Sequence, residues 1–285
     1  MLRIGDYEVI SIDDGLFRLD GGAMFGVVPK TLWEKVAPAD GKNRIPLGVR
    51  PLLIRGRGET VLVDAGLGDK EDAKFDGFFS VERPRKLMTA LAAAGVRPAD
   101  VTRVIFTHLH FDHDGGATRR EGMKAVLVFP NARHLVQRIE WEEATHPNRR
   151  TRGSYLPENI GPLGESGNLD LLDGDTEILP GLRVHVTGGH CRGHQMVFIE
   201  GGGRTAAYWG DLVPTAAHLR VPYVMGYDLF PIEVMEGKEA LLPRAAREGW
   251  INFWAHDPAI AASLLREENG EVVLGDEVSA VARGS

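Results

Sequence analysis

The sequence predicts an α+β fold in which two packed mixed sheets carry helices on their outer faces. Short apolar and β-branched runs come in clusters in both halves of the 285-residue chain, and stretches with helical spacing lie between them. No tandem repeat, low-complexity tract or linker separates the halves. This pattern is typical of two layers of strands with helices outside. We therefore expect residues 1–285 to form a single domain.

In the first half, strands are expected where β-branched and apolar residues run together. These runs cover residues 7–12, 50–54, 60–64, 102–106 and 133–136. Short helices are expected near 30–36 and around 140–144, and a helix over 80–94 is predicted by the near-helical spacing of its apolar residues. Gly95 suits the position after the helix over 80–94, because glycine adopts the left-handed conformation that ends many helices.

The second half repeats this alternation of strands and helix. Strands are expected over residues 182–187, 196–199, 205–209, 251–255 and 272–274. A helix is expected over residues 233–247, interrupted or restarted at Pro243, because proline lacks the backbone N–H that a helix interior needs.

Composition limits the partners and the compartment. The net charge is −7 and no basic run exceeds the Arg149-Arg150 region, which argues against a surface that follows nucleic-acid phosphates. No segment approaches the ~18 consecutive apolar residues that span a bilayer. The N-terminus lacks the pattern of a secretory signal, and the single cysteine, Cys191, suits a reducing compartment. We expect a cytoplasmic protein with no nucleic-acid or membrane partner.

A dense group of metal-ligand side chains follows the strand expected at 102–106. Three imidazoles and a carboxylate occupy six residues, namely His108, His110, Asp112 and His113. Imidazole nitrogen and carboxylate oxygen are ligands that Zn²⁺ prefers. In an extended segment His108 and His110 point the same way, whereas Asp112 and His113 fall where the chain turns and face a second metal. The segment predicts a metal site, since a polar loop would seldom contain this pattern by chance.

Three later strands end in further ligand types. His190 follows the strand expected at 182–187 on a loop with two glycines, Asp211 follows 205–209, and His256 follows 251–255. Any one of them alone would be read as a turn or capping residue. Because several strands deliver such residues to what we expect to be one rim, they are expected to complete the site of the first segment.

This set of residues resembles the metallo-β-lactamase superfamily of binuclear hydrolases, from Asp64 to His256. The resemblance implies an αβ/βα sandwich with the site at one sheet edge. It also implies two ligand groups and a bridge: His108, His110 and His190 on one metal, Asp112, His113 and His256 on the other, and Asp211 between them.

The chemistry of two metals supports such a bridge. Two divalent ions held close together need an anion between them, which Asp211 and a hydroxide supply. That hydroxide is the expected nucleophile, because coordination lowers the pKa of water to near ~7. Asp112 suits the acceptance and transfer of a proton, so Asp112 and Asp211 are the predicted catalytic residues. We expect two Zn²⁺ ions, although Fe²⁺, Mn²⁺ and Co²⁺ suit the same ligands.

Supporting residues are expected around the ligands. Asp64, Asp114 and Asp257 are expected to orient imidazoles, with ordinary turn aspartates as the alternative for Asp114 and Asp257. Residues 189–194 resemble the Gly-His-Thr-Pro-Gly-His loop of lactonases, in which the first histidine binds metal and the second supports the loop. That resemblance assigns His194 a supporting role.

Two stretches resemble a narrower group of enzymes. Residues 21–30 with 43–47 resemble N-acyl-homoserine lactonases, and residues 211–228 resemble these and methyl parathion hydrolases. An apolar wall for an acyl chain is expected from Met24, Phe25 and Phe111, with core or dimer contact as the alternative for Met24 and Phe25. Lactonases carry a tyrosine three residues after the bridging aspartate, where this chain has Pro214. Tyr223 or His218 is expected to replace it, with action of the metals alone as the alternative.

The sequence therefore predicts a homodimeric binuclear hydrolase that opens lactones, N-acyl-homoserine lactones in particular. A phosphotriesterase or arylesterase of the methyl parathion hydrolase kind is the alternative within the same chemistry. A metal protein that hydrolyses nothing, with a redox or sensing role, is the alternative from another class.

Overall fold

Two seven-stranded sheets form the centre of the molecule. The computed structural model describes residues 2–84 and 86–280, and every statement of number below refers to these. The strand order of the first sheet is β1 (Leu2–Ile4), β2 (Tyr7–Ser11), β5 (Leu52–Gly56), β6 (Glu59–Val63), β7 (Arg103–Ile105), β10 (Arg133–Gln137) and β11 (Leu169–Leu172). That of the second is β12 (Thr176–Leu179), β13 (Leu182–Val186), β14 (Gln195–Gly201), β15 (Arg204–Tyr208), β16 (Ile251–Phe253), β17 (Ala262–Glu268) and β18 (Glu271–Glu277).

Both sheets are mixed. In the first sheet β6, β7, β10 and β11 run parallel to one another, and the remaining pairs are antiparallel. In the second sheet only β15 and β16 are parallel. Two small hairpins lie outside these sheets, β3 (Leu16–Asp20) with β4 (Arg44–Gly48), and β8 (Thr118–Glu121) with β9 (Lys124–Leu127).

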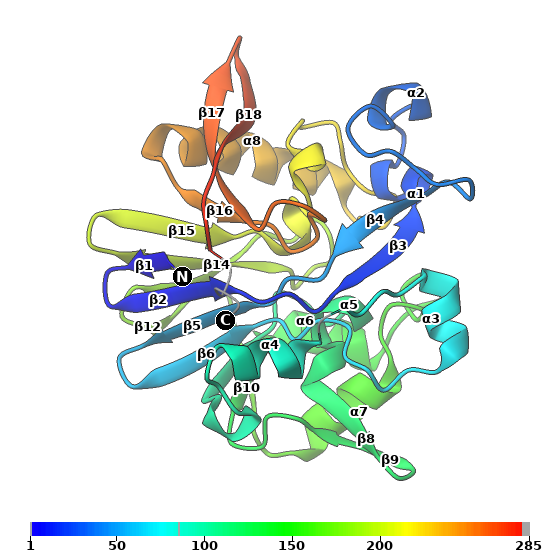
Figure 1. Cartoon of the computed structure of the whole chain (residues 1–285), viewed down its shortest axis with the longest axis vertical. Helices are drawn as coiled ribbons and strands as arrows, with labels where there is room; N and C mark the ends of the chain where they lie inside the picture. The colour runs from blue at the N-terminus through cyan, green and yellow to red at the C-terminus, as the bar shows by residue number, and fades with distance from the viewer. Residues whose placement is uncertain (1, 85, 281–285) are drawn as a thin grey trace.

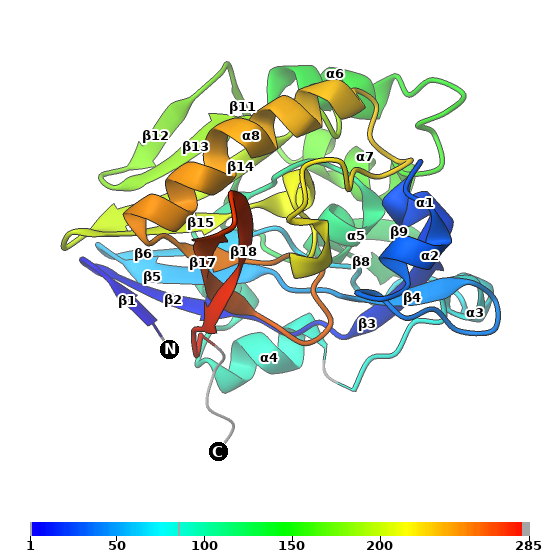
Figure 2. The same ribbon diagram turned by 90° about the horizontal axis from the view of Figure 1, so that it is seen from above.

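Helices lie on the two outer faces and at the end of the molecule where the β3–β4 hairpin projects (Figures 1 and 2). They are α1 (Gly21–Phe25), α2 (Lys30–Trp33), α3 (Ala73–Phe79), α4 (Leu87–Ala93), α5 (Phe111–Asp114), α6 (Arg138–Thr145), α7 (Pro157–Glu165) and α8 (Pro231–Glu248). Single 3-10 turns occupy Pro98–Asp100, Gly115–Ala117, Gly210–Leu212 and Ala216–His218. Figures 1 and 2 show α8 over the second sheet, with α4, α6 and α7 on the far side of the first. None of these helices is long and apolar enough to cross a membrane.

The side-chain alternation of the strands explains this layering. Val61, Val63 and Ile105 of the first sheet pack with Val197 and Ile199 of the second in one buried cluster between the sheets. The alternate residues face outward: Leu62 and Val104 pack with Leu91 of α4. On the other side Phe198 packs with Leu242 of α8. Since successive residues of a strand point to opposite faces, each sheet has two apolar faces to bury. The layered fold expected from the sequence is confirmed.

One expected helix was wrong in its first half. Helix α3 ends at Phe79, before the expected helix over 80–94 begins, and α4 starts only at Leu87. Residue 85 lies outside the described residues. Ser80 has a left-handed φ of 47° that ends α3. The residue before Pro84 is biased away from helix, so α4 begins only after it. Leu87 then donates its N–H to Asp14, 2.5 Å away on a different loop.

The expected break at Pro243 was also wrong. Helix α8 continues from Pro231 to Glu248 with Pro243 inside it. Pro231 has a fixed φ that suits the first helical position, and Gly249, with φ 64°, ends the last turn. The side chains of Val234, Leu242 and Ala245 are buried against the second sheet on both sides of Pro243. This packing outweighs the loss of one helical hydrogen bond.

Candidate metal centre

The predicted ligands lie where strands of both sheets end. Strand β7 leads into Thr107 and His108, and His110 forms the N-cap of the short helix α5, which carries Asp112 and His113. From the second sheet, His190 follows β13, Asp211 lies in the turn after β15, and His256 follows β16. Because β7, β15 and β16 end at the same edge of the sandwich, residues far apart in sequence meet there.

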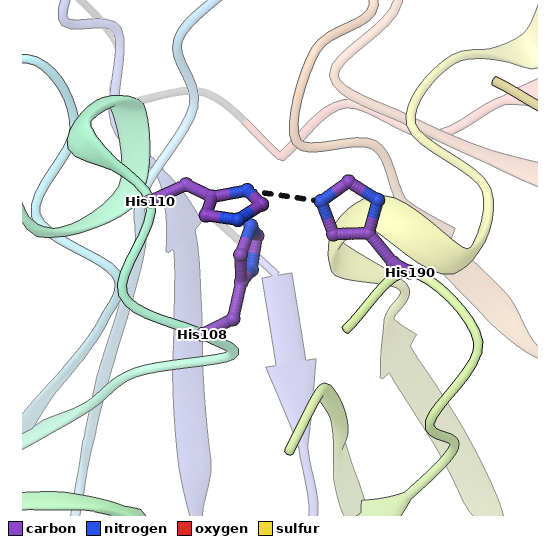
Figure 3. Close-up of side chains that lie close together, drawn as sticks. All are labelled: His108, His110 and His190. Atoms are coloured by element: carbon purple, nitrogen blue, oxygen red, sulfur yellow. Dashed lines mark hydrogen bonds between the residues drawn. The ribbon is translucent and has the colours of Figure 1, made fainter. Parts of the chain in front are cut away.

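The first group of ligands contains His108, His110 and His190. Figure 3 shows the three imidazoles converging from two separate segments. The Nδ1 atom of His110 lies 3.1 Å from Nε2 of His190. One nitrogen of each ring lies within 4.8 Å of the others, so one ion would be in reach of all three.

The second group contains Asp112, His113 and His256, again within 4.8 Å of one another. The two Nε2 atoms of His113 and His256 lie 2.9 Å apart, and Oδ2 of Asp112 lies 3.6 Å from Nε2 of His256. These two groups coincide with the two ligand sets that the sequence resemblance implied.

Asp211 lies between the two groups. Its Oδ2 atom is 3.3 Å from Nε2 of His190, while its Oδ1 atom is 3.3 Å from Nε2 of His113 and 3.2 Å from Nε2 of His256. One carboxylate oxygen thus faces each group, which is the arrangement a bridging ligand needs. Gly210, just before it, has a φ of 53°, and a Cβ there would lie 2.6 Å from His194, so glycine is required at this turn.

Neighbouring polar groups fix the orientation of the imidazoles through their other nitrogen. Nδ1 of His113 donates to Asp64, Nδ1 of His190 to Asp228, and Nδ1 of His256 to the Gly48 carbonyl, each at 2.8 Å. Each bond leaves the lone pair of Nε2 directed into the centre. Partners of this kind orient the histidine ligands of metal sites and raise their basicity.

The charge states suit a metal-binding site. Burial and the neighbouring imidazoles lower the pKa of His108 and His110 well below 6.5, so these rings are neutral and have a free lone pair. Burial opposes the charge of His113 as well, but Asp211 and Asp64 outweigh it and raise its pKa well above 6.5. The same carboxylates that hold a proton there attract a divalent cation.

The residues present fit such cations on structural grounds. Nε2 of His108 and Oδ1 of Asp211 are buried and have no hydrogen-bond partner among the described residues. The Nε2 atoms of His113 and His256 lie 2.9 Å apart although both rings donate from Nδ1, so either the proton of His113 or a metal cation must separate the two lone pairs. Buried polar atoms without partners are costly unless a ligand satisfies them.

The expected supporting residues have different positions. Asp64 bonds to His113 as expected. His194 accepts the N–H of Asp211 at 2.9 Å, and burial lowers its pKa to about 3, so it supports the bridging residue as a neutral ring. Asp114 instead accepts from Asn159, and Asp257 accepts the N–H groups of residues 216, 259 and 260. Neither touches an imidazole, which corresponds to the alternative of structural turn aspartates.

A cavity of about 450 Å³ opens above the ligands. His110, Asp112, His190, Asp211 and His256 line it, and its apolar wall is formed by Leu19, Met24, Leu47, Phe78, Phe79, Phe111, Met225 and Leu229. Met24 and Phe111 thus lie where the sequence placed them.

Three residues expected at the substrate pocket lie behind its wall. Phe25 stacks on the imidazole of His218, with ring centroids 4.5 Å apart, and meets Tyr223 edge to face. His218 also bonds to the Met24 carbonyl at 2.8 Å. All three are buried and none lines the cavity. They support the wall from behind and do not present polar atoms to a substrate.

Sequence reasoning missed several residues of the site. Asp228, which orients His190, lies in the loop 222–230, and no local pattern marks it as a partner of a residue near the end of β13. Arg150 lines the cavity from the loop between α6 and α7, and Tyr227 lines it from the loop that contains Asp228. Glu140, buried in α6, accepts the N–H of Leu109 at 2.9 Å and the hydroxyl of Tyr155 at 3.0 Å. Only the burial of an acid in an otherwise apolar helix face would have signalled Glu140.

Comparison with known proteins places the chain among metal-dependent hydrolases. The model of the metallo-beta-lactamase superfamily matches residues 44–267, well over half of the chain. An N-acyl homoserine lactonase from Bacillus cereus is 31% identical over 168 residues, which make up 55% of this chain and 60% of that enzyme. The match to lactonases from Bacillus thuringiensis covers 53% of their length, so the chain spans little more than half of these relatives.

Solved structures match over a longer range. A "probable metal-dependent hydrolase" from Staphylococcus aureus is 34% identical with a TM-score of 0.89, over 97% of this chain and 100% of that one. An N-acyl homoserine lactone hydrolase with N-hexanoyl-L-homoserine at its catalytic metal centre is 25% identical with a TM-score of 0.68, over 90% of this chain and 95% of that one.

Proposed function

The chain belongs to the metallo-beta-lactamase superfamily, and we propose that it is a binuclear metal-dependent hydrolase that opens lactones, N-acyl homoserine lactones in particular. The observation that supports this most directly is the position of Asp211, with one oxygen toward each ligand group at the floor of the cavity. The apolar wall beside this floor suits an acyl chain. Zinc is the proposed metal, because five imidazoles and two carboxylates are ligands it prefers.

The ligand groups determine what the chain contributes to catalysis. Two divalent cations, held by the two ligand groups, would supply Lewis acidity toward an ester carbonyl and would make water nucleophilic near neutral pH. Asp112 lines the cavity beside this point, so its carboxylate takes the proton of the attacking water. It returns that proton to the ring oxygen as the C–O bond breaks. One water is consumed and one hydroxy acid is formed.

A titration at constant pH tests the proposal, because each lactone opened near neutral pH releases one proton. The purified protein, with its metal content measured by elemental analysis, is given N-hexanoyl-homoserine lactone, phenyl acetate and paraoxon in parallel. We expect about two metal ions per chain and the highest kcat/KM for the lactone. Preference for paraoxon would favour the phosphotriesterase alternative.

Variants of the ligands provide the second arm of this test. His113→Ala and Asp211→Ala are expected to abolish turnover and to lower the metal content, because each removes one ligand side chain from the floor of the cavity. His146→Ala, at the exposed C-cap of α6, is the control and should change neither. A fully metal-loaded protein that hydrolyses no ester, or that consumes oxygen with bound iron, would contradict the proposed hydrolase.

A further inference from the structure

One cationic side chain lines the cavity besides the imidazoles of the metal centre. Arg150 lies on its wall in the loop between α6 and α7. The other lining residues outside the ligand set are apolar, or are neutral groups such as Thr151, Ser154 and Tyr227. A guanidinium beside an apolar wall marks a place where a substrate carries oxygen.

The loop holds the backbone of Arg150 in place. The Asn148 side chain accepts the N–H groups of Arg150 at 2.8 Å and of Thr151 at 3.2 Å, which forms a local turn. The carbonyl of Ser154 accepts the N–H of Phe111 at 2.9 Å, so the loop is bonded to the start of α5 and hence to the ligand segment. The backbone that carries the guanidinium is therefore held in a fixed position relative to the metal centre.

The side chain reaches across to the loop that lies opposite. Nη2 of Arg150 donates to the Gly226 carbonyl at 2.6 Å and to the Asp228 carbonyl at 3.3 Å. The carboxylate of Asp228 is not its partner, because that group accepts from His190 and from the N–H of Met225. No carboxylate among residues 2–84 and 86–280 forms an ion pair with Arg150.

These bonds determine which N–H donors of Arg150 remain available to a substrate. A carboxylate or phosphate is gripped by two parallel N–H bonds, and both edges of a guanidinium that present such a pair include Nη2. Since Nη2 already donates to two carbonyl oxygens of the loop, a forked grip on an anion would have to displace these bonds. The hydrogens on Nη1 and Nε diverge, so each suits a single oxygen atom and not a forked anion.

We propose that Arg150 donates a hydrogen bond to one uncharged carbonyl oxygen on the acyl part of the substrate. The protein then selects lactones whose side chain carries an amide over lactones with a plain alkyl chain. The inference rests on the proposed lactonase function and adds the residue that recognises the amide. Arg150 is exposed at the cavity wall, and a charged donor makes a stronger bond than a neutral one, so its loss is expected to cost about tenfold in affinity.

Two lactones that differ in the amide test this selectivity. N-hexanoyl-homoserine lactone carries the amide carbonyl, whereas γ-decalactone carries only an alkyl chain. In Arg150→Met the kcat/KM for the amide lactone divided by that for γ-decalactone is expected to fall about tenfold, mainly through a higher KM for the amide lactone. Arg149→Met is the matched control, because Arg149 is exposed, lies next to Arg150 and does not line the cavity. Arg150→Lys should restore part of the ratio.

A binding measurement separates recognition from turnover. N-cyclopentylhexanamide has the amide and a ring but no ester to hydrolyse. By calorimetry its Kd should rise about tenfold in Arg150→Met and stay the same in Arg149→Met. Equal losses for both lactones, or an unchanged Kd in Arg150→Met, would overturn the role of Arg150 alone. If the wild-type protein opened neither lactone, the proposed function would fall, and this inference with it.

Discussion

At the residue scale, the metal centre depends on a carboxylate outside the ligand groups, that of Asp228. Asp228 accepts Nδ1 of His190 with one oxygen and the N–H of Met225 with the other. It therefore joins a ligand to the loop that forms one wall of the cavity. Loss of such a partner usually reduces metal affinity 10–100-fold, because the ring loses its orientation and some of its basicity.

Asp228→Asn is accordingly expected to weaken metal binding by about tenfold or more. An amide keeps the shape of the side chain but not its charge, so the fold should persist. Competition with a metal chelator measures the change. Asp276→Asn, at an exposed position of β18, is the control. Equal affinities in the two variants would show that Asp228 has no role in holding His190.

His134 is a buried histidine that the metal centre does not use. Neither of its ring nitrogens has a hydrogen-bond partner within residues 2–84 and 86–280, and the ring stacks on Phe106 with centroids 6.2 Å apart. Burial lowers its pKa to about 4. Because the folded pKa lies below the unfolded value of 6.5, the unfolded chain binds more protons between these values. The free energy of unfolding contributed by this ring is therefore lost as the pH falls from about 6.5 to 4.

His134→Leu should remove this acid sensitivity, which is worth on the order of 3 kcal/mol. Urea unfolding at pH 5 and pH 7.5 measures it: the variant should gain stability at pH 5 relative to the wild type, and less at pH 7.5. The exposed His146 provides the control variant His146→Leu. An identical pH dependence in wild type and His134→Leu would contradict the assignment.

Tyr227 carries a hydroxyl on the cavity wall, close to the apolar residues Met225 and Leu229. Burial raises its pKa to about 12, so the hydroxyl remains a hydrogen-bond donor at any working pH. Tyr227→Phe is expected to lower the kcat/KM of lactone hydrolysis about tenfold with no change in metal content. Steady-state kinetics with elemental analysis checks this, and an unchanged kcat/KM would exclude contact with the substrate.

At the element scale, the longest helix contains a residue that disfavours it. Pro243 lies in the interior of α8 and provides no N–H to the preceding turn. Pro243→Ala is expected to restore one hydrogen bond and to raise the stability by about 1 kcal/mol or more. Thermal unfolding should show a Tm higher by a few degrees. A lower Tm would mean that the proline stabilises through the unfolded chain or through its packing.

Elements that depend on local pattern could be predicted from the sequence, and those that depend on distant contacts could not. Strands β6 and β7 are short runs of β-branched residues, and their positions are as expected. Helix α4 begins where Asp14 caps it from a distant loop, and no pattern near Leu87 reports this contact. Hairpin β3–β4 encloses two short helices, of which α2 was expected and α1 was not.

At the scale of the whole molecule, the metal centre joins the two sheets. His108, His110 and His113 belong to segments of the first sheet, whereas His190 and His256 belong to the second. A cation held by either group is bonded to both layers of the sandwich. Since metal binds the folded chain and not the separated layers, its binding free energy adds to the stability of the sheet packing.

Removal of the metals should therefore lower the Tm substantially, on the order of 10 °C if both sites are well saturated. Differential scanning calorimetry before and after chelation measures the shift, and added Zn²⁺ should reverse it. The variant His113→Ala, which lacks a ligand, should show a smaller shift. A Tm that stays constant after complete removal of metal would contradict the joining of the sheets through the centre.

The ligands themselves could be predicted because each one is a distinctive residue type at the end of a recognisable strand. Asp228, which orients His190, and Arg150, which lines the cavity, could not be predicted. Both are common residue types in loops whose course depends on the whole fold. For the same reason His218 and Tyr223 were expected at the pocket and lie behind it. The expected homodimer stays a prediction, which light scattering of the purified protein will check.

The division of each ligand group between the sheets also orders events during synthesis. His108 and His110, or Asp112 and His113, leave the ribosome long before His190 and His256. A nascent chain that ends before β13 has only two ligands of each group, too few for a tight site. The first group is therefore complete only once the chain has been made past β13, and the second only once it has been made past β16.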